Sequence, residues 1–312
     1  MKAVKIMSVL LCAAVCASGL IDTAALVRAP QGEADAEEIR RIWDEGLVRQ
    51  RKASPQSATP QYRRVTRPLP RSQGTSPVPQ SAQAVVGVTV WRLRPSASDD
   101  EVRELIHERT GPDDEEKRVS MTPVRVEAET PLDKGERVRI SIESSREGYL
   151  YVVDRELYED GSKGRPLLIF PTERTLEGNN HVRAGRPVTI PAKTDDPPYF
   201  TVRPNPNRRD QVAEQLLIII SDQPLSLPLT PQAQVLRTNT VNTWEARWAA
   251  PFERVEQVGG AGRPITKAES EAAGDEVREL WQGDPAPQSV YRLRRRTSNP
   301  FLLKVSLPFK RR

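Results

Sequence analysis

Cysteine and histidine are scarce in this 312-residue chain, and their scarcity excludes several kinds of chemistry. Both cysteines, Cys12 and Cys16, lie within the first 25 residues. If that stretch is removed as a leader, the rest of the chain forms no disulfide, no zinc-thiolate site and no cysteine nucleophile. The two histidines, His107 and His181, lie in different regions, so we expect no histidine-rich metal cluster. A Ser-His-Asp triad would have to use one of them.

Nucleotide and nucleophile motifs are also missing. GSKG at 161–164 is neither a phosphate-binding loop nor a nucleophile elbow, and GGAG at 259–262 lacks the third glycine of a dinucleotide fingerprint. Carboxylates remain, since 42 acidic residues provide a pair somewhere by chance alone. Glu214 and Asp154, at strand ends, are the two we expect to be partly buried. We therefore predict no cofactor and no catalysis; a hydrolase would instead need a cleft with two carboxylates about 5–10 Å apart.

The first 25 residues have the pattern of a secretory signal peptide. Lys2 and Lys5 precede an apolar run from Ile6 to Ala17, and small residues follow. The run is too short for a membrane span and no comparable run occurs later, so we expect an exported protein, periplasmic or secreted, without a transmembrane segment after cleavage. Lipid anchoring at Cys16 is not favoured, because Ala-Ala-Val is a poor match before such a cysteine.

Two segments follow the leader before any strand pattern begins. Residues 26–51 contain a short amphipathic helical segment, which docks on a partner, packs on its own domain or stays loose. Residues 52–84 hold six prolines and five basic residues but no acidic one, which predicts an extended, disordered linker. Its densest basic cluster is Arg63-Arg64, so we expect no nucleic-acid partner. Residues 310–312 form a basic tail.

Residues 85–309 have the pattern of a β domain. With aromatic residues at only 5%, the core must be mainly aliphatic. The short strands are separated by turns and not by helices, which predicts an antiparallel β-sandwich with immunoglobulin-like layering. We expect strands at 85–94, 138–144, 148–154, 166–171, 186–191, 199–202, 214–221, 289–294 and 301–308.

Helices are predicted only as small insertions. The segments 99–109 and 266–281 share the string EVREL, and Trp244 and Trp248 lie one helical turn apart, which is typical of a helix over one edge of the core. VWRLR at 90–94 and VYRLR at 290–294 are nearly identical, but the strands between them do not recur. We therefore predict one domain and not a duplication, and leave open whether the two stretches pair.

The strings GYLYVVDRELYEDGSKGRPLLIFPT, PYFTV and EQLLIIIS are similar to those of the bacterial family called domain of unknown function 4384 (DUF4384). With WRLRPSASDD, WEARW and SVYRLR, the resemblance extends over roughly residues 85–309. It implies an exported, sandwich-like module, often joined to other envelope or signalling domains. It implies no established catalysis.

Candidate site residues surround the strand that begins at Gly148, where a missing Cβ eases a tight bend. Tyr149 and Tyr151 share one face of this strand and Leu150 and Val152 the other. The tyrosines either shape the core or form an exposed strip that binds a glycan or a peptide. The residues that we expect to form a ligand or partner surface are Tyr149, Tyr151, Phe170, Asn179 and Asn180.

The acidic turn after this strand offers a weak cation site at Asp154, Glu156 and Asp160. The loop lacks two of the oxygen ligands of an EF-hand, so an exposed acidic hairpin turn is the alternative interpretation. The leading hypothesis is an exported, non-catalytic interaction or structural module of the bacterial envelope with a protein partner. The alternatives are a carbohydrate-binding module and a carboxylate-dependent hydrolase acting on cell-wall or extracellular polymer.

Overall fold

The computed structural model describes residues 84–110, 115–257, 259–273, 280–281, 283–293 and 300–310. The predicted signal peptide, the helical segment at 26–51 and, apart from Ala84, the linker at 52–84 lie outside the described residues, as do the last two residues of the basic tail.

The first of two sheets is built around the long strand β1. Its main path runs β12-β13-β1-β3-β2, while β4 pairs with β1 and also with β8 and β9. Every pairing between these strands is antiparallel. The strands are β1 (Val85–Pro95), β2 (Glu104–Thr110), β3 (Glu115–Val126), β4 (Arg137–Ser144), β8 (Pro187–Ile190), β9 (Phe200–Thr201), β12 (Phe252–Glu256) and β13 (Ser289–Leu293).

The second sheet is built around the antiparallel pair β5 and β10. Its path runs β11-β6-β5-β10-β14, and β7 pairs with the start of β5. The strands are β5 (Gly148–Tyr158), β6 (Leu167–Phe170), β7 (His181–Val182), β10 (Gln211–Ser221), β11 (Gln234–Val235) and β14 (Phe301–Pro308). All nine predicted strand segments are strands in the structure, and β6 ends at Phe170, immediately before Pro171, as its sequence predicts.

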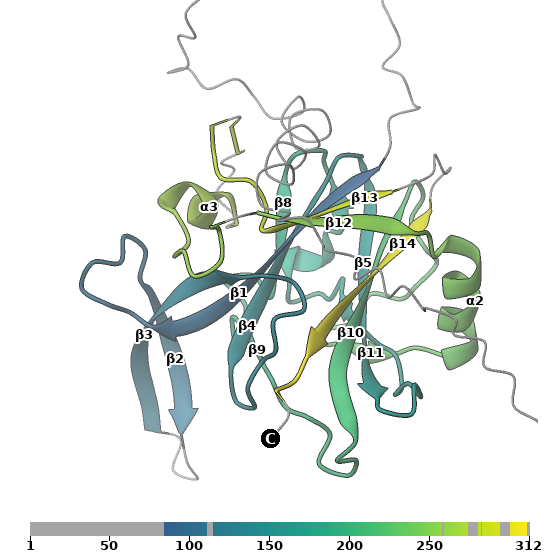
Figure 1. Cartoon of the computed structure of the whole chain (residues 1–312), viewed down its shortest axis with the longest axis horizontal. Coiled ribbons are helices and arrows are strands. Elements are labelled where there is room, and N and C mark those ends of the chain that lie inside the picture. Colours follow the sequence, from purple (N-terminus) through teal and green to yellow (C-terminus); the bar gives the residue numbers. More distant parts are fainter. Residues whose placement is uncertain are drawn as a thin grey trace, which may run out of the picture. The chain divides into compact units, whose positions relative to one another are not determined.

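The two sheets share one aliphatic core. Alternate residues of the long strands point into it, because side chains of a strand alternate between its faces. Val86, Val88 and Val90 of β1 pack there with inward residues of β4, β5, β10 and β14. The prediction of a mainly β, antiparallel sandwich is therefore confirmed, and Figure 1 shows the two sheets with β1 and β4 in one and β5, β10 and β14 in the other.

The near-identical stretches at 90–94 and 290–294 belong to two strands of the same sheet. β1 pairs with β13 antiparallel, with Val85 opposite Arg292 and Val88 opposite Ser289. The pairing brings the beginning of the described domain next to a strand near its end. The two strands therefore pair, but the stretch at 90–94 itself pairs with β3 and β4 and not with its near-copy on β13.

One helix prediction is wrong, and another is confirmed over Lys267–Ala272, while residues 274–279 lie outside the described residues. Residues 104–110 form β2, which pairs with β3, so the patch at 99–109 is not helical. Ile106 is buried against Leu93 and Met121 while Leu105 is 58% exposed, an alternation that a neighbouring strand can pair with. In the segment 266–281 the helix α3 spans Lys267–Ala272, begun by a capping box between Thr266 and Glu269.

The predicted helix with two tryptophans is α2 (Thr238–Trp248), and it covers the outer face of the second sheet (Figure 1). Val241 is buried there with Tyr151 and Leu217, and the rings of Trp244 and Trp248 stack with centroids 5.6 Å apart. Within the described residues, no helix is both long and apolar enough to cross a bilayer.

Gly148 is required by a close approach between strands. A Cβ at this position would lie 2.7 Å from the carbonyl oxygen of Ser221 on β10 and 3.1 Å from Ile220 Cγ2. We expect Gly148→Ala to lower the free energy of unfolding by about 1–3 kcal/mol, because backbone must move to admit the methyl group. Urea denaturation of the purified protein measures it. Gly283→Ala, whose Cβ meets nothing within 4 Å, is the control; equal stability of both variants would contradict this account.

Candidate functional site

A polar groove of about 670 Å³ opens along β8. We call it the β8 groove: it is lined by side chains from residues 174–189, by Thr194 and by Ala272 and Ala273 at the end of α3. The lining segment leaves the second sheet at β7 and enters the first sheet at β8. The groove therefore lies where the chain crosses between the two layers, and its volume falls in the range of small-molecule sites.

A strained turn forms one wall of the β8 groove. Leu176, Glu177 and Gly178 have φ angles of 52°, 53° and 78°, and they form the short turn η2 (Leu176–Gly178). A left-handed conformation costs a residue with a Cβ roughly 1–2 kcal/mol, so two such residues in succession must be held by their surroundings. Leu176 packs against the core, which places Glu177 on the exposed side of the turn.

A tight turn places two arginines at the groove. The backbone N–H of Arg186 donates to the carbonyl of Arg183 at 3.1 Å, and Gly185 between them has a φ angle of 76°. A β-turn brings its first and fourth Cα atoms within about 7 Å, and glycine supplies the positive φ that its third position needs here. The Cα atoms of Arg183 and Arg186 are therefore close together, and both residues line the groove.

The charge of the groove wall is strongly positive. Arg174, Arg183 and Arg186 line it, and within the described parts of the chain none of the three has a carboxylate at ion-pair distance. Glu177 is the acidic residue of the lining. Guanidinium groups carry a permanent charge and present several N–H donors in one plane. The wall can therefore bind carboxylate or phosphate oxygens.

The two predicted asparagines lie beside this groove, with different roles. Asn179 is exposed and lines it, and its Oδ1 accepts from the backbone N–H of His181 at 3.2 Å, so that its amide Nδ2 remains for a ligand. Asn180 instead donates Nδ2 to the carbonyl of Leu150 at 3.0 Å and so ties the turn to β5. The ring of His181 lies edge-on to Tyr149, with centroids 5.3 Å apart.

Two residues of the predicted surface are buried and do not belong to it. Tyr151 is 3% exposed beneath α2 and the 222–236 segment, and its hydroxyl accepts from the backbone N–H of Leu225 at 2.7 Å. Phe170 is fully buried between the sheets. The tyrosine face of β5 is therefore covered on the outer side of its sheet, and of the two predicted tyrosines only Tyr149 is partly exposed.

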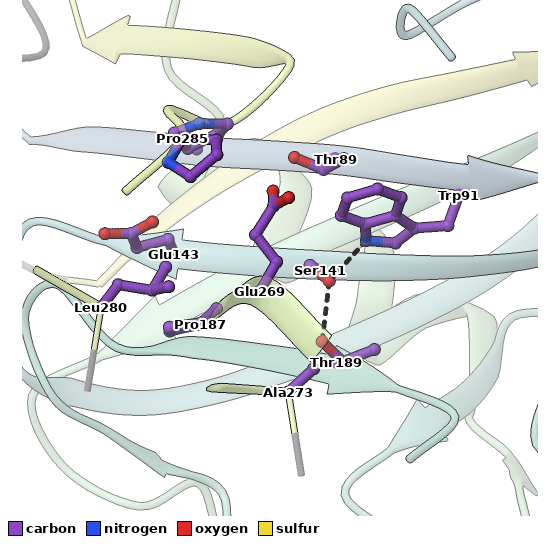
Figure 2. A pocket seen from close by; sticks show the side chains of 12 residues that line it. Thr89, Trp91, Ser141, Glu143, Pro187, Thr189, Glu269, Ala273, Leu280 and Pro285 are labelled. Atoms are coloured by element: carbon purple, nitrogen blue, oxygen red, sulfur yellow. Dashed lines mark hydrogen bonds between the residues drawn. The ribbon is translucent and has the colours of Figure 1, made fainter. Parts of the chain in front are cut away.

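A second, smaller cavity of about 30 Å³ lies under α3 on the outer face of the first sheet (Figure 2). We call it the α3 chamber; it shares Pro187, Thr189 and Ala273 with the β8 groove. Trp91 Nε1 donates to Ser141 Oγ at 2.8 Å, and Ser141 and Thr189 are hydrogen-bonded at 2.7 Å. This volume accommodates only one or two water molecules, so the chamber is not a site for an organic ligand.

Of the two carboxylates that line the α3 chamber, Glu143 and Glu269, the second is fully engaged. Glu269 forms an ion pair with the buried Arg125 and accepts from Thr266 N and Oγ1 at 3.0 and 2.8 Å. Arg125 also donates to the carbonyl of Ala286 at 2.6 Å. This network fixes α3 and the 285–287 segment on the sheet, so its role is structural.

The predicted cation site does not assemble. Within the part of the chain that the structure describes, no three acidic, histidine or cysteine side chains are placed to hold a metal ion. Asp160 lies at the exposed hairpin turn, where its Oδ1 accepts from Ser162 N at 2.8 Å. Asp154 and Glu156 lie away from that turn. They alternate along β5 in step with Leu150 and Val152, which face the core, so their side chains lie on the same inner face of the strand.

Three carboxyl groups instead meet on the inner face of the second sheet. Glu214 of β10 lies directly opposite Glu156 of β5, and Asp154 is the diagonal neighbour. Burial, reinforced by Glu156, raises the pKa of Asp154 to about 7, and its Oδ1 is buried without a hydrogen-bond partner. Burial and the charges of Asp154 and Glu156 raise the pKa of Glu214 to about 8. At neutral pH this cluster therefore holds protons.

The raised pKa of Glu214 makes stability depend on pH. The folded state keeps a proton that the unfolded chain loses, so stability falls as pH rises from about 4 through about 8. We expect Glu214→Gln to be more stable than the parent by roughly 1–3 kcal/mol near pH 9 and similar near pH 4. Denaturant titrations across this range measure the difference. Glu159→Gln, at an exposed turn, is the control; parallel pH curves for the parent and Glu214→Gln would refute the assignment.

The fold and the groove together define a β-sandwich with a polar, basic cleft at one crossing between its sheets. The family model described as "Domain of unknown function (DUF4384)" matches residues 132–224. The resemblance predicted from the sequence is confirmed over this segment, which includes β4 to β10 and the part of the groove contributed by residues 174–194. No curated protein and no solved structure matches the chain.

The sequence reasoning missed the three groove arginines. Arg174, Arg183 and Arg186 are separated by a turn, a short strand and a second turn, so their convergence depends on the path of the chain. A local signal was present in HVRAGR, where a glycine lies between two arginines at β-turn spacing. It predicts neighbouring guanidinium groups but not the groove behind them.

Proposed function

We propose that this chain is an exported, non-catalytic β-sandwich of the bacterial cell envelope that binds its partner in the β8 groove. The observation that carries the proposal is the groove itself: it has the volume of a ligand site, and three arginines line it without a carboxylate partner among the described residues. Arginines left unpaired in a concave site favour recognition of an external anion.

Binding is favoured over hydrolysis by the placement of the carboxyl groups. A glycoside hydrolase of the common type needs two carboxyl groups facing one cleft. The lining of the β8 groove contributes Glu177, whereas Asp154 and Glu214 lie on the inner face of the second sheet. A binding role requires only hydrogen-bonding groups and charge, and the lining of the β8 groove provides both.

A glycan-binding role would have to use the groove and not the face of β5. Tyr151 is buried and Tyr149 is engaged with His181, so the two rings form no flat exposed strip. Sugar recognition without such a platform depends on hydrogen bonds and charge, which the groove wall offers.

Export is tested by the fate of the first 25 residues. We expect a tagged full-length chain produced in a bacterial host to appear in the periplasm or medium at the mass of the processed protein, because Lys2 and Lys5 precede an apolar run. Intact-mass spectrometry of each fraction measures this. Leu10→Arg with Leu11→Arg should retain the unprocessed chain in the cytoplasm. An unprocessed cytoplasmic parent would contradict export.

Binding through the groove is tested by filling it. Thr194→Trp places a large ring in the groove, whereas Thr243→Trp places the same ring on the exposed side of α2. We expect immobilised envelope fraction to retain the parent and Thr243→Trp, and to retain Thr194→Trp at least about tenfold more weakly. Biolayer interferometry measures the retention. Equal retention of the two variants would exclude the groove as the site, and no retention of the parent would refute the binding role.

A further inference from the structure

We infer that the β8 groove binds an acidic saccharide, with a sugar carboxylate held between Arg183 and Arg186. The inference deepens the proposed function and rests on it, because it names the class of ligand for the same groove. It is carried by three features of the groove wall: its charge, the spacing of two arginines, and the uncharged hydrogen-bonding groups around them.

The charge of the wall selects an anion. Three guanidinium groups face one carboxylate, that of Glu177, in the groove lining. Elsewhere in the described chain, well-buried arginines are matched with acids: Arg139 lies 2.7 Å from Glu104, and Arg155 lies 2.9 Å from Glu245. The groove arginines have no such partner among the described residues, so their donors are available to a ligand.

The turn geometry selects a small planar anion. Arg183 and Arg186 are the first and fourth residues of a β-turn closed by a 3.1 Å hydrogen bond, with Gly185 buried between them. Their Cα atoms are thus within about 7 Å, which lets two guanidinium groups approach the two oxygens of one carboxylate. The backbone fixes the spacing of the two Cα atoms, so binding of the carboxylate has to order only the two side chains.

The floor of the groove is held rigidly by the neighbouring loops. Asp195 accepts hydrogen bonds from Thr175 Oγ1 and from the backbone N–H of Ala192, and so joins the segments on the two sides of the groove. Lys193 donates to the carbonyl of Ser270 on α3 at 2.7 Å. The walls of the groove are therefore connected by side-chain hydrogen bonds.

The remaining lining suits hydroxyl groups. The Glu177 carboxylate accepts hydrogen bonds, the Asn179 amide donates them, and Thr194 does both; all three are exposed in the groove. Inorganic phosphate has no sugar hydroxyls for these groups, and the charge of Glu177 repels it. A sugar ring carries both hydroxyls for these groups and, in an acidic saccharide, the carboxylate for the arginines.

An acidic peptide fits the groove less well than a saccharide. A peptide that joins a sheet edge needs a row of free backbone groups. β8 spans only four residues, begins at Pro187 and is followed by Pro191, and proline lacks the backbone N–H that strand addition uses. Recognition in this groove therefore depends on side chains.

The test is isothermal titration of the purified protein with tri-galacturonic acid, and with tri-galactose as the neutral counterpart of the same size. We expect tri-galacturonic acid to bind and the neutral trimer to bind at least about tenfold more weakly, because only the former offers carboxylates to the arginines. Arg183→Glu with Arg186→Glu should weaken acidic-trimer binding at least about tenfold. Absence of acidic-trimer binding overturns the inference.

Matched variants separate the groove from overall charge and from misfolding. Arg165, Arg203 and Arg209 are exposed and lie outside the groove lining, so Arg165→Glu with Arg203→Glu reverses the same number of charges. This control should bind the acidic trimer as tightly as the parent does. Arg183→Lys and Arg186→Lys should bind it with affinities between that of the parent and that of the groove variant with two glutamates. Equal losses in the control and groove variants overturn the assignment. Far-ultraviolet circular dichroism establishes that each variant is folded.

Titration with a hexaglutamate peptide tests the alternative that the groove binds an acidic peptide. Peptide binding as tight as that of the acidic trimer, and abolished by the same groove substitutions, overturns the saccharide assignment in favour of an acidic peptide. If the Thr194→Trp experiment shows groove-dependent retention by the envelope fraction while tri-galacturonic acid does not bind, the ligand class is wrong and the binding function stands. If neither experiment shows binding, both proposals fail.

Discussion

The paired strands β5 and β10 are buried on both faces, and this constraint organises the rest of the domain. Leu216, Ile218 and Ile220 face the first sheet, while Leu217 and Ile219 face α2 on the other side. A sheet that is apolar on both sides must be covered twice. The first sheet covers one side, and α2 with the segment around Leu225 and Leu227 covers the other.

This double cover accounts for the position of the β8 groove at a crossing between the sheets and not on a sheet face. Wherever β5 and β10 could present a broad face, another layer occupies it, which is why Tyr151 is buried. The chain that passes from β7 to β8 forms a turn, and the backbone N–H of Gly185 donates to the carbonyl of Ser144 on β4 at 3.0 Å. Exposed side chains on such a segment do not have to fill the core and can carry charge, as binding loops commonly do on rigid scaffolds.

The strand pattern was largely predictable because aliphatic residues that alternate with a period of two, in segments this short, indicate a half-buried strand. Val138, Ile140 and Ile142 of β4 alternate cleanly and are all in the core. The segment 99–109 failed because Val102, Leu105 and Ile106 fit a helical stripe equally well. The partner that decided between the two structures, β3, pairs with β2 along its length, and pairing is not visible in local periodicity.

The site was less predictable than the fold for a physical reason. Phe170 and Tyr151 were selected because aromatic residues can form ligand platforms, but the same property makes them good core residues, and here burial prevailed. Asn179 lies beside the groove because a turn residue with an amide tends to remain at the surface. Whether exposed residues face a common cavity depends on the crossing of the two sheets, which no stretch of the sequence encodes by itself.

The arginines of this domain include a buried group with acidic partners and a more exposed group in the β8 groove, and this difference bears on function. Arg125, Arg139 and Arg155 are at most 3% exposed, and each has an acidic partner: Glu269, Glu104 and Glu245. Burial of a guanidinium without a counter-charge would cost several kcal/mol, so each of these buried arginines needs its carboxylate in the folded state. Arg174 and Arg183 are exposed and Arg186 is half-buried, so folding makes no such demand on them. Stability therefore does not account for their common position in one groove, whereas the anionic ligand proposed above would supply the counter-charge that the described part of the chain does not.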